Sequence, residues 1–377
     1  MTPETSSTLT KVGLSTVPAM RRAVSVSSWG FDRVGAVLAI CRVQIYQIMK
    51  LISKERLLTD EGQKARIAFG CAALAGLYAP VSVADARDVL EAAWDAGIRR
   101  FDTAPFYGLG LSEQLVGDFL REKARADFTL SSKVGRLLEA PDDDAPDPPF
   151  GHLRHSVRFD YSHDGIMRSY EQSLARLGLD RIDILYVHDI GEFAHGPEAN
   201  ARHMRDLTGS GLKALERLKA EGAIAGFGLG VNETAVCLDL MDHAEFDEIL
   251  LAGRYTLLDR SAEEALLPRA RVAGTRLVIG GVFNSGILAT GPGPDAHFNY
   301  EPATPDIQEK VAAIAAIAGR YGLALPEAAI NFPADHPCVS HILIGTGKRY
   351  SLMRNLEQFG TALPRDFLSE ILPFTIR

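Results

Sequence analysis

Cysteine is scarce in this sequence, and the cysteines present are far apart. The 377 residues contain four of them, Cys41, Cys71, Cys237 and Cys338, and no two form a CxxC pair. Disulfide scaffolds and thiolate zinc sites need closely spaced cysteines, so we expect neither. This usage fits a reducing compartment, and we expect a cytoplasmic protein.

Positive charge and long apolar runs are also lacking. Lys and Arg number 40 against 48 Asp and Glu, and the formal net charge is −8. Such a chain has no excess of cations for a phosphate backbone, so we expect no nucleic-acid partner. The longest apolar run near the N-terminus, 34–41, contains a glycine and is followed by Arg42. It is too short to cross a bilayer, so we expect a soluble protein with no membrane partner.

Residues with the spacing of a metal site are lacking as well. His152 and His155 form an HxxH pair in a proline-rich stretch, without a carboxylate at metal-site spacing. We therefore expect no metal.

The first 53 residues differ in composition from the remainder. Residues 1–28 are rich in Ser, Thr and Val, and 30–52 are apolar but interrupted by Arg33, Arg42 and Lys50. No cleavage pattern of small residues follows an apolar core of suitable length. We predict a dispensable, poorly ordered extension over 1–53 and one domain over 54–377. A weak targeting segment and a start codon assigned too early remain alternatives.

From about residue 54, short apolar runs alternate with longer segments of helical spacing. The predicted strands are 66–70, 99–102, 128–133, 183–187, 224–230, 247–252, 276–281 and 341–345. The predicted helices are 83–96, 112–123, 165–177, 212–221, 233–242, 262–273, 306–320 and 349–359. Eight βα units favour an α/β fold of the (β/α)8 TIM-barrel type over an open sheet. We expect 139–163 to be an extended loop over the barrel mouth and 291–305 to be a second long connection.

Four polar residues stand where predicted strands end and the following loops begin. Asp102 ends the second strand, Tyr107 follows it, Lys133 ends the third strand and His188 ends the fourth. Barrel enzymes carry their reactive side chains at such points. A phenol needs a neighbouring cation to exchange protons near neutrality, and Lys133, held by Asp102, supplies one. These residues therefore predict a proton-transfer site in which the pKa of Tyr107 is lowered.

The same four residues resemble the catalytic Asp, Tyr, Lys and His of the aldo-keto reductase superfamily. The resemblance extends to further phrases in the same order, namely FDTA (101–104), YG (107–108), SE (112–113), RS (168–169), SL (173–174), RLGLD (176–180) and ID (182–183). It covers residues 64 to 359 and implies a (β/α)8 oxidoreductase that uses NAD(P).

Three longer phrases are similar to one branch of that superfamily, the aldose 1-dehydrogenases. They are FDYS (159–162), LYVHD (185–189) and LLAGRYTLLD (250–259). The branch includes D-threo-aldose (L-fucose), L-galactose and pyridoxal 4-dehydrogenases, which oxidise a hemiacetal hydroxyl to a lactone. The resemblance thus implies oxidation of an aldose such as L-fucose. Oxidation of pyridoxal, a general aldo-keto reductase activity and a cofactor-sensing role with incidental turnover are the alternatives.

The resemblance also indicates where the cofactor binds. It implies nicotinamide contacts from Asn232 and from Phe283 with Asn284. It assigns the pyrophosphate and adenosine ribose to the segment that contains Gly345, Thr346, Gly347, Lys348 and Asn355. Two family positions differ, because Val231 and Ala252 replace the usual Ser and Gln. We favour NAD over NADP, since the branch often uses NAD.

Two aromatic residues in the first two βα loops, Tyr78 and Phe106, are predicted to form walls of the substrate site, with simple packing as the alternative. The sequence leaves the oligomeric state open.

Overall fold

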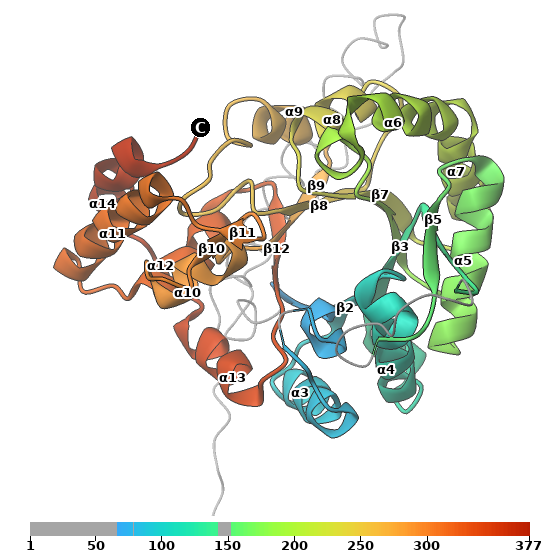
Figure 1. Cartoon of the computed structure of the whole chain (residues 1–377), viewed down its shortest axis with the longest axis horizontal. Helices are drawn as coiled ribbons and strands as arrows, with labels where there is room; N and C mark the ends of the chain where they lie inside the picture. Colours follow the sequence, from blue (N-terminus) through green and yellow to red (C-terminus); the bar gives the residue numbers. More distant parts are fainter. Residues whose placement is uncertain (1–65, 78, 142–151) are drawn as a thin grey trace, which may run out of the picture. The chain divides into compact units, whose positions relative to one another are not determined.

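Eight parallel strands of this computed structural model form a closed barrel, which surrounds the centre of Figure 1. The structure describes residues 66–77, 79–141 and 152–377, so the predicted extension 1–53 lies outside the described residues. The barrel strands are β1 (Ile67–Gly70), β2 (Arg100–Asp102), β3 (Thr129–Val134), β6 (Ile184–His188), β7 (Gly226–Val231), β8 (Glu248–Ala252), β9 (Arg276–Gly280) and β12 (Val339–Ile344). Each pairs with its neighbours in parallel, and β12 closes the circle on β1. All eight predicted strands and the predicted TIM-barrel class are confirmed.

Helices cover the outside of the barrel (Figure 1). They are α3 (Val83–Asp95), α4 (Leu111–Leu120), α5 (His163–Leu177), α6 (Glu192–Asp206), α7 (Leu212–Ala220), α8 (Ala235–Leu240), α9 (Leu266–Ala273), α10 (Ile287–Thr290), α11 (Pro305–Arg320), α12 (Leu325–Asn331), α13 (Arg349–Gln358) and α14 (Arg365–Ile371). Eight of them match the predicted helices. The other four, α6, α10, α12 and α14, were not predicted.

Local signals explain where several of these helices begin and end. Ser82 caps α3, because its hydroxyl accepts the backbone N–H of Asp85 at 3.1 Å. Ser162 caps α5 in the same way through Gly165 at 3.2 Å. Gly178 ends α5 with φ +60°, a left-handed conformation that a glycine adopts without strain.

Two segments that were predicted as loops contain short antiparallel hairpins. β4 (Arg136–Glu139) pairs with β5 (Ser156–Phe159), and β10 (His297–Phe298) pairs with β11 (Glu301–Pro302). The prediction of an extended loop over 139–163 is therefore wrong for β5. β5 has only four residues, and the proline-rich segment separates it in sequence from its partner β4. The pairing is therefore not visible in the local sequence.

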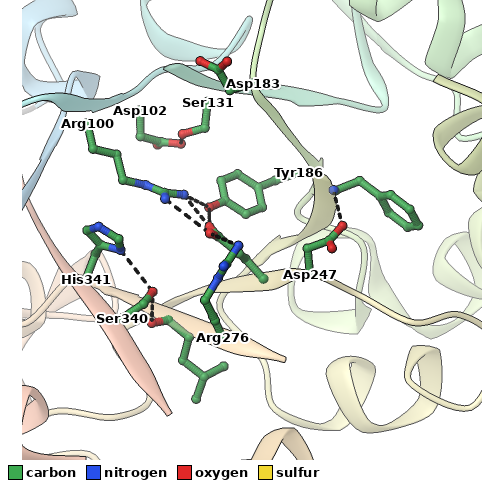
Figure 2. Close-up of polar contacts among 12 residues, drawn as sticks. Arg100, Asp102, Ser131, Asp183, Tyr186, Asp247, Arg276, Ser340 and His341 are labelled. Atoms are coloured by element: carbon green, nitrogen blue, oxygen red, sulfur yellow. Dashed lines mark hydrogen bonds and ion pairs between the residues drawn. The ribbon is translucent and has the colours of Figure 1, made fainter. Parts of the chain in front are cut away.

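The barrel interior is apolar in its middle and ionic at the N-terminal ends of the strands. Alternate residues of the strands form the apolar cluster Ile184, Tyr186, Leu250 and Val278. Below it, the carboxylate of Glu248 pairs with Arg100 and Arg276 and accepts the hydroxyl of Tyr186 at 2.8 Å (Figure 2). Glu248 is 1% exposed.

No single helix in the described part of the chain is long and apolar enough to span a membrane. The segments Pro305–Arg320 and Leu325–Asp335 pass such a test only as a pair bent by 95°. The protein core includes Val311, Ile314, Ile317 and Ile330 of these segments.

Candidate active site

One cavity of about 820 Å³ contains all four residues that the sequence predicts to be catalytic. Asp102 ends β2, Lys133 lies near the end of β3 and His188 ends β6. Tyr107 begins a short 3-10 turn, Tyr107–Gly110, in the loop that follows β2. The barrel thus brings together four side chains that are up to 86 positions apart, at the carboxyl ends of its strands.

Lys133 and Asp102 form a buried ion pair at the base of this cavity. The Nζ of Lys133 lies 2.5 Å from Oδ1 of Asp102 and also donates to the backbone oxygen of Thr103 at 2.9 Å. The other carboxylate oxygen of Asp102 accepts the hydroxyl of Ser131 at 2.7 Å. Because both charged groups are paired and hydrogen-bonded, the low-dielectric interior can hold them. The ammonium of Lys133 also lies 4.7 Å from the ring centroid of Tyr107.

The ion pair determines the charge of Lys133 and influences Tyr107. Burial lowers the pKa of Lys133, but Asp102 and Tyr107 outweigh this effect and hold it above its usual value. Burial raises the pKa of Tyr107, and although Lys133 opposes this, the net pKa stays above the usual value. The expected net lowering of the Tyr107 pKa is therefore wrong. Sequence reasoning identified the cation and omitted the larger cost of removing a phenolate from water.

His188 is neutral in this setting. Burial, followed by the positive charges of Arg136 and Lys133, lowers the pKa of His188 well below its usual value. Its ring lies edge-on to Tyr107, with 6.0 Å between the centroids and 88° between the planes. The buried Nδ1 has no hydrogen-bond partner among the described residues. A neutral imidazole beside the phenol can orient a substrate oxygen through a hydrogen bond.

The residues predicted to contact nicotinamide line the same cavity. Asn232 follows β7, and Phe283 with Asn284 follows β9. The side-chain amide of Asn284 is already engaged, because its Oδ1 accepts Thr256 at 2.6 Å and its Nδ2 donates to the oxygen of Gly253 at 3.1 Å. Of the three predicted residues, Asn232 and Phe283 thus remain to contact a nicotinamide, Asn232 through its amide and Phe283 through its aromatic ring.

A second cavity, of about 560 Å³, lies beside the first and shares Ala73 and Gly345 with it. It contains the predicted pyrophosphate segment, Gly345 to Lys348, and the N-terminus of α13. A Cβ on Gly345 would lie 2.7 Å from the backbone oxygen of Gly70, so only glycine fits there without displacement. Backbone N–H groups at a helix N-terminus suit phosphate oxygens. The two joined cavities thus fit the two ends of a dinucleotide.

The second cavity also contains acidic side chains that the sequence analysis did not consider. Asp88 of α3 pairs with Arg349 at 2.7 Å, and Asp85 also lines this cavity. Arg349, a cation available for a 2′-phosphate, is thus already paired with a carboxylate.

Two of the predicted site residues, Asn355 and Tyr78, are not found among the residues that line the two cavities. Asn355 lines neither cavity, because it lies with Leu352 and Leu356 on the buried face of α13 and is 6% exposed. Tyr78 lies outside the described residues. Phe106 lines the first cavity and is 42% exposed.

Sequence reasoning missed one side of the first cavity. Arg136, Phe159, Asp189 and Phe193 line it together with Phe106. Asp189 directly follows His188, and Arg136 lies three positions beyond Lys133, so their places just after strand ends were the available signal. Phe193 belongs to α6, which was not predicted.

Comparisons with known proteins agree with this geometry. The model of the aldo/keto reductase family matches residues 66–373. The chain is 45% identical over 313 residues to a pyridoxal 4-dehydrogenase of Microbacterium luteolum, which covers 80% of this chain and 91% of that protein. It is 38% identical over 314 residues to a D-threo-aldose 1-dehydrogenase of a Pseudomonas species, which covers 81% of this chain and 92% of that protein.

A solved structure shares the fold. An aldo-keto reductase of Bacillus halodurans in its holo form superposes with a TM-score of 0.65 at 23% identity and covers 82% of this chain and 92% of that one. Together with the family match, this confirms the resemblance on which the sequence analysis relied. The chain belongs to the aldo/keto reductase family of NAD(P)-dependent oxidoreductases.

Proposed function

We propose that this protein oxidises the hydroxyl of a cyclic hemiacetal to a lactone, with a nicotinamide cofactor as hydride acceptor. The observation that carries the proposal is the group Tyr107, Lys133, Asp102 and His188 around one cavity, with the Lys133–Asp102 pair at 2.5 Å. The substrate loses one hydride and one proton, so an ester carbonyl forms at the reacting carbon. The cofactor supplies the redox chemistry by accepting the hydride.

In this proposal Tyr107 takes the proton from the substrate hydroxyl. Its phenolate form is stabilised by the ammonium of Lys133, which remains charged because Asp102 holds it. Neutral His188 orients the reacting oxygen by a hydrogen bond and carries no proton away. Asn232 and Phe283 hold the nicotinamide ring beside this group, and Gly345 to Lys348 bind the pyrophosphate.

The charge distribution of the second cavity supports NAD over NADP. The Arg349 guanidinium is occupied by Asp88, and a 2′-phosphate entering this cavity would approach the carboxylates of Asp85 and Asp88. Like charges repel, so these carboxylates oppose the attraction that Lys348, a cation of the same cavity, has for a 2′-phosphate, and the unphosphorylated ribose is the better ligand.

The lining of the first cavity supports pyridoxal as the substrate. Phe106, Phe159 and Phe193 line the same cavity as His188, and the ring of Phe106 lies edge-on to His188 at 6.4 Å between centroids. Flat aromatic substrates gain stacking energy on such walls. The relative with 45% identity is named as a pyridoxal 4-dehydrogenase.

An aldose such as L-fucose is the second candidate. The cavity also presents the polar groups of Arg136, Asp189 and Asn232, which are suitable partners for sugar hydroxyls. The relative with 38% identity is named for an aldose. A role restricted to sensing the cofactor has less support, because the complete proton-transfer group would serve no purpose in it.

The test is a measurement of NADH or NADPH formation with pyridoxal, L-fucose, D-arabinose and L-galactose and with either nucleotide. We expect turnover of pyridoxal with NAD to be fastest. Fastest turnover of L-fucose would move the assignment to the aldose. Tight cofactor binding without oxidation of any of the four would reject the proposed function.

A further inference from the structure

A second buried cation lies in the first cavity, beyond the Lys133–Asp102 pair. Arg136 begins β4, is 7% exposed and lines the same cavity as Tyr107 and His188. β4 leaves the barrel directly after β3, and its pairing with β5 sets Arg136 opposite Phe159. The hairpin therefore holds this guanidinium beside the reacting group.

The guanidinium is only partly satisfied by protein groups. Its single hydrogen bond to a described residue runs from Nη2 to Oδ2 of Asp189. The buried Nε has no partner among the described residues. A guanidinium has five N–H donors, so Arg136, which lines the cavity and gives one hydrogen bond to Asp189, keeps donors for an acceptor on a ligand.

The surroundings of Arg136 strengthen its attraction for an anionic oxygen. Its guanidinium carbon lies 4.1 Å from the ring centroid of Phe106 and 5.1 Å from that of Phe159. Arg136 is itself 7% exposed, and a hydrogen bond between two charged groups is stronger where the surrounding dielectric is low.

Asp189 fixes this cation close to the catalytic imidazole. Its Oδ2, which accepts Nη2 of Arg136, lies 3.4 Å from Nε2 of His188. Its backbone adopts φ +47°, a conformation that non-glycine residues rarely take, and its N–H donates to Gly230 at 2.9 Å. When the reacting carbon of an aromatic ligand lies next to His188, a substituent on the neighbouring carbon of the ligand's ring is therefore within reach of Arg136.

We propose that Arg136, held by Asp189, is a specificity residue that binds an ionised phenolic oxygen on the ring carbon adjacent to the ring carbon that carries the reacting carbon. This inference rests on the proposed function and narrows its substrate class to aromatic cyclic hemiacetals that carry such a hydroxyl, for example on a 3-hydroxypyridine ring. Sugar hydroxyls are neutral and make weaker hydrogen bonds to a guanidinium.

Two unreactive amides test the inference without turnover. Salicylamide has a phenol on the carbon next to its carbonyl-bearing carbon, and benzamide lacks it. Neither is reduced by NADH, so their binding to the enzyme–NADH complex can be measured by calorimetry or by nucleotide fluorescence. We expect the wild-type protein to bind ionised salicylamide at least about tenfold more tightly than benzamide.

The variant Arg136→Met should reduce this ratio to near one while it changes benzamide binding only a few fold. Arg136→Lys keeps the charge without the forked donors and should retain part of the preference. Arg158→Met is the matched control. It removes the same charge from the paired strand β5, where the side chain of Arg158 is 41% exposed. A full preference in Arg136→Met overturns the inference, and so does equal or absent binding of the two amides by the wild type. Failure of the proposed function appears separately, as absent oxidation in the substrate screen.

Discussion

The Nζ of Lys133 lies 2.5 Å from Oδ1 of Asp102, and the two side chains are only 2% and 3% exposed. This pair places a permanent positive charge next to the ring of Tyr107 in a cavity that is otherwise lined mostly by apolar side chains. Proton transfer at Tyr107 therefore depends on a contact between two strands and on the burial of the phenol itself.

Replacement of Tyr107 by Phe should nearly abolish oxidation. We expect kcat to fall at least about 10³-fold, since the hydroxyl that accepts the proton is lost. Cofactor affinity should change by less than about threefold, because the ring remains. Steady-state kinetics and nucleotide titration check these outcomes. Tyr350→Phe, an exposed tyrosine outside both cavities, is the control. A Tyr107→Phe enzyme with wild-type kcat would refute the proposed role.

Replacement of Lys133 by Met should shift the pH dependence of oxidation upward. Oxidation needs deprotonated Tyr107, whose pKa is raised by burial and partly brought down by Lys133. Activity should therefore rise with pH in the wild type, and the rise should move by about one unit or more to higher pH in Lys133→Met. Lys219→Met, which removes a cation that pairs with Asp247, should leave the profile in place.

The Lys133–Asp102 pair itself should not limit stability in the neutral range. The folded-state pKa of Lys133 is raised above its unfolded value. Its stabilising contribution is thus complete below the unfolded pKa of about 10.4 and is lost only as the pH rises through the folded value. Lys133→Met, by contrast, leaves Asp102 buried without its partner and should be less stable at every pH, so circular dichroism at each pH must show that the variant is folded where its activity is measured.

Replacement of Asp88 by Asn should improve NADP binding. The change releases Arg349 and removes a carboxylate from the second cavity. We expect NADP affinity to rise about threefold to tenfold and NAD affinity to change by less than about twofold, in line with the modest strength of exposed pairs. Fluorescence titration measures both. Glu91→Gln, on the same helix, is the matched control. Unchanged NADP affinity in Asp88→Asn would contradict the proposed basis of NAD preference.

Replacement of Glu248 by Gln should destabilise the barrel without acting at the site. Glu248 joins Arg100, Arg276 and Tyr186 at the N-terminal ends of the strands, whereas His188 ends β6 and Tyr107 follows β2. Removal of the carboxylate leaves the largely buried Arg100 without its ionic partner and should lower the free energy of unfolding by about 3 kcal/mol. Denaturant titration compares it with exposed Glu245→Gln. A loss below about 1 kcal/mol, the range of surface substitutions, would show that the cluster contributes little.

Local sequence was sufficient for the framework of this protein. Each barrel strand is a short apolar run followed by a helix, and caps such as Ser82 and Ser162 are visible in the chain. Because parallel strands in a barrel end on one face, Asp102, Lys133 and His188 could be expected to meet before any coordinates were known. The family resemblance added the NAD(P)-dependent oxidation and the cofactor segments.

Contacts between distant segments were beyond this kind of reasoning. Asp88 and Arg349 are 261 positions apart, and Arg136 and Asp189 are 53 positions apart. Neither pairing follows from strand or helix periodicity, because each depends on how loops and helices pack around the barrel. The same holds for the pKa of Tyr107, whose direction is set by burial that no local pattern reports. The chain's own order of residues thus specifies which groups can react. The packed interior specifies their charge states, and the side chains brought in from remote positions shape the space in which substrate and nucleotide are selected.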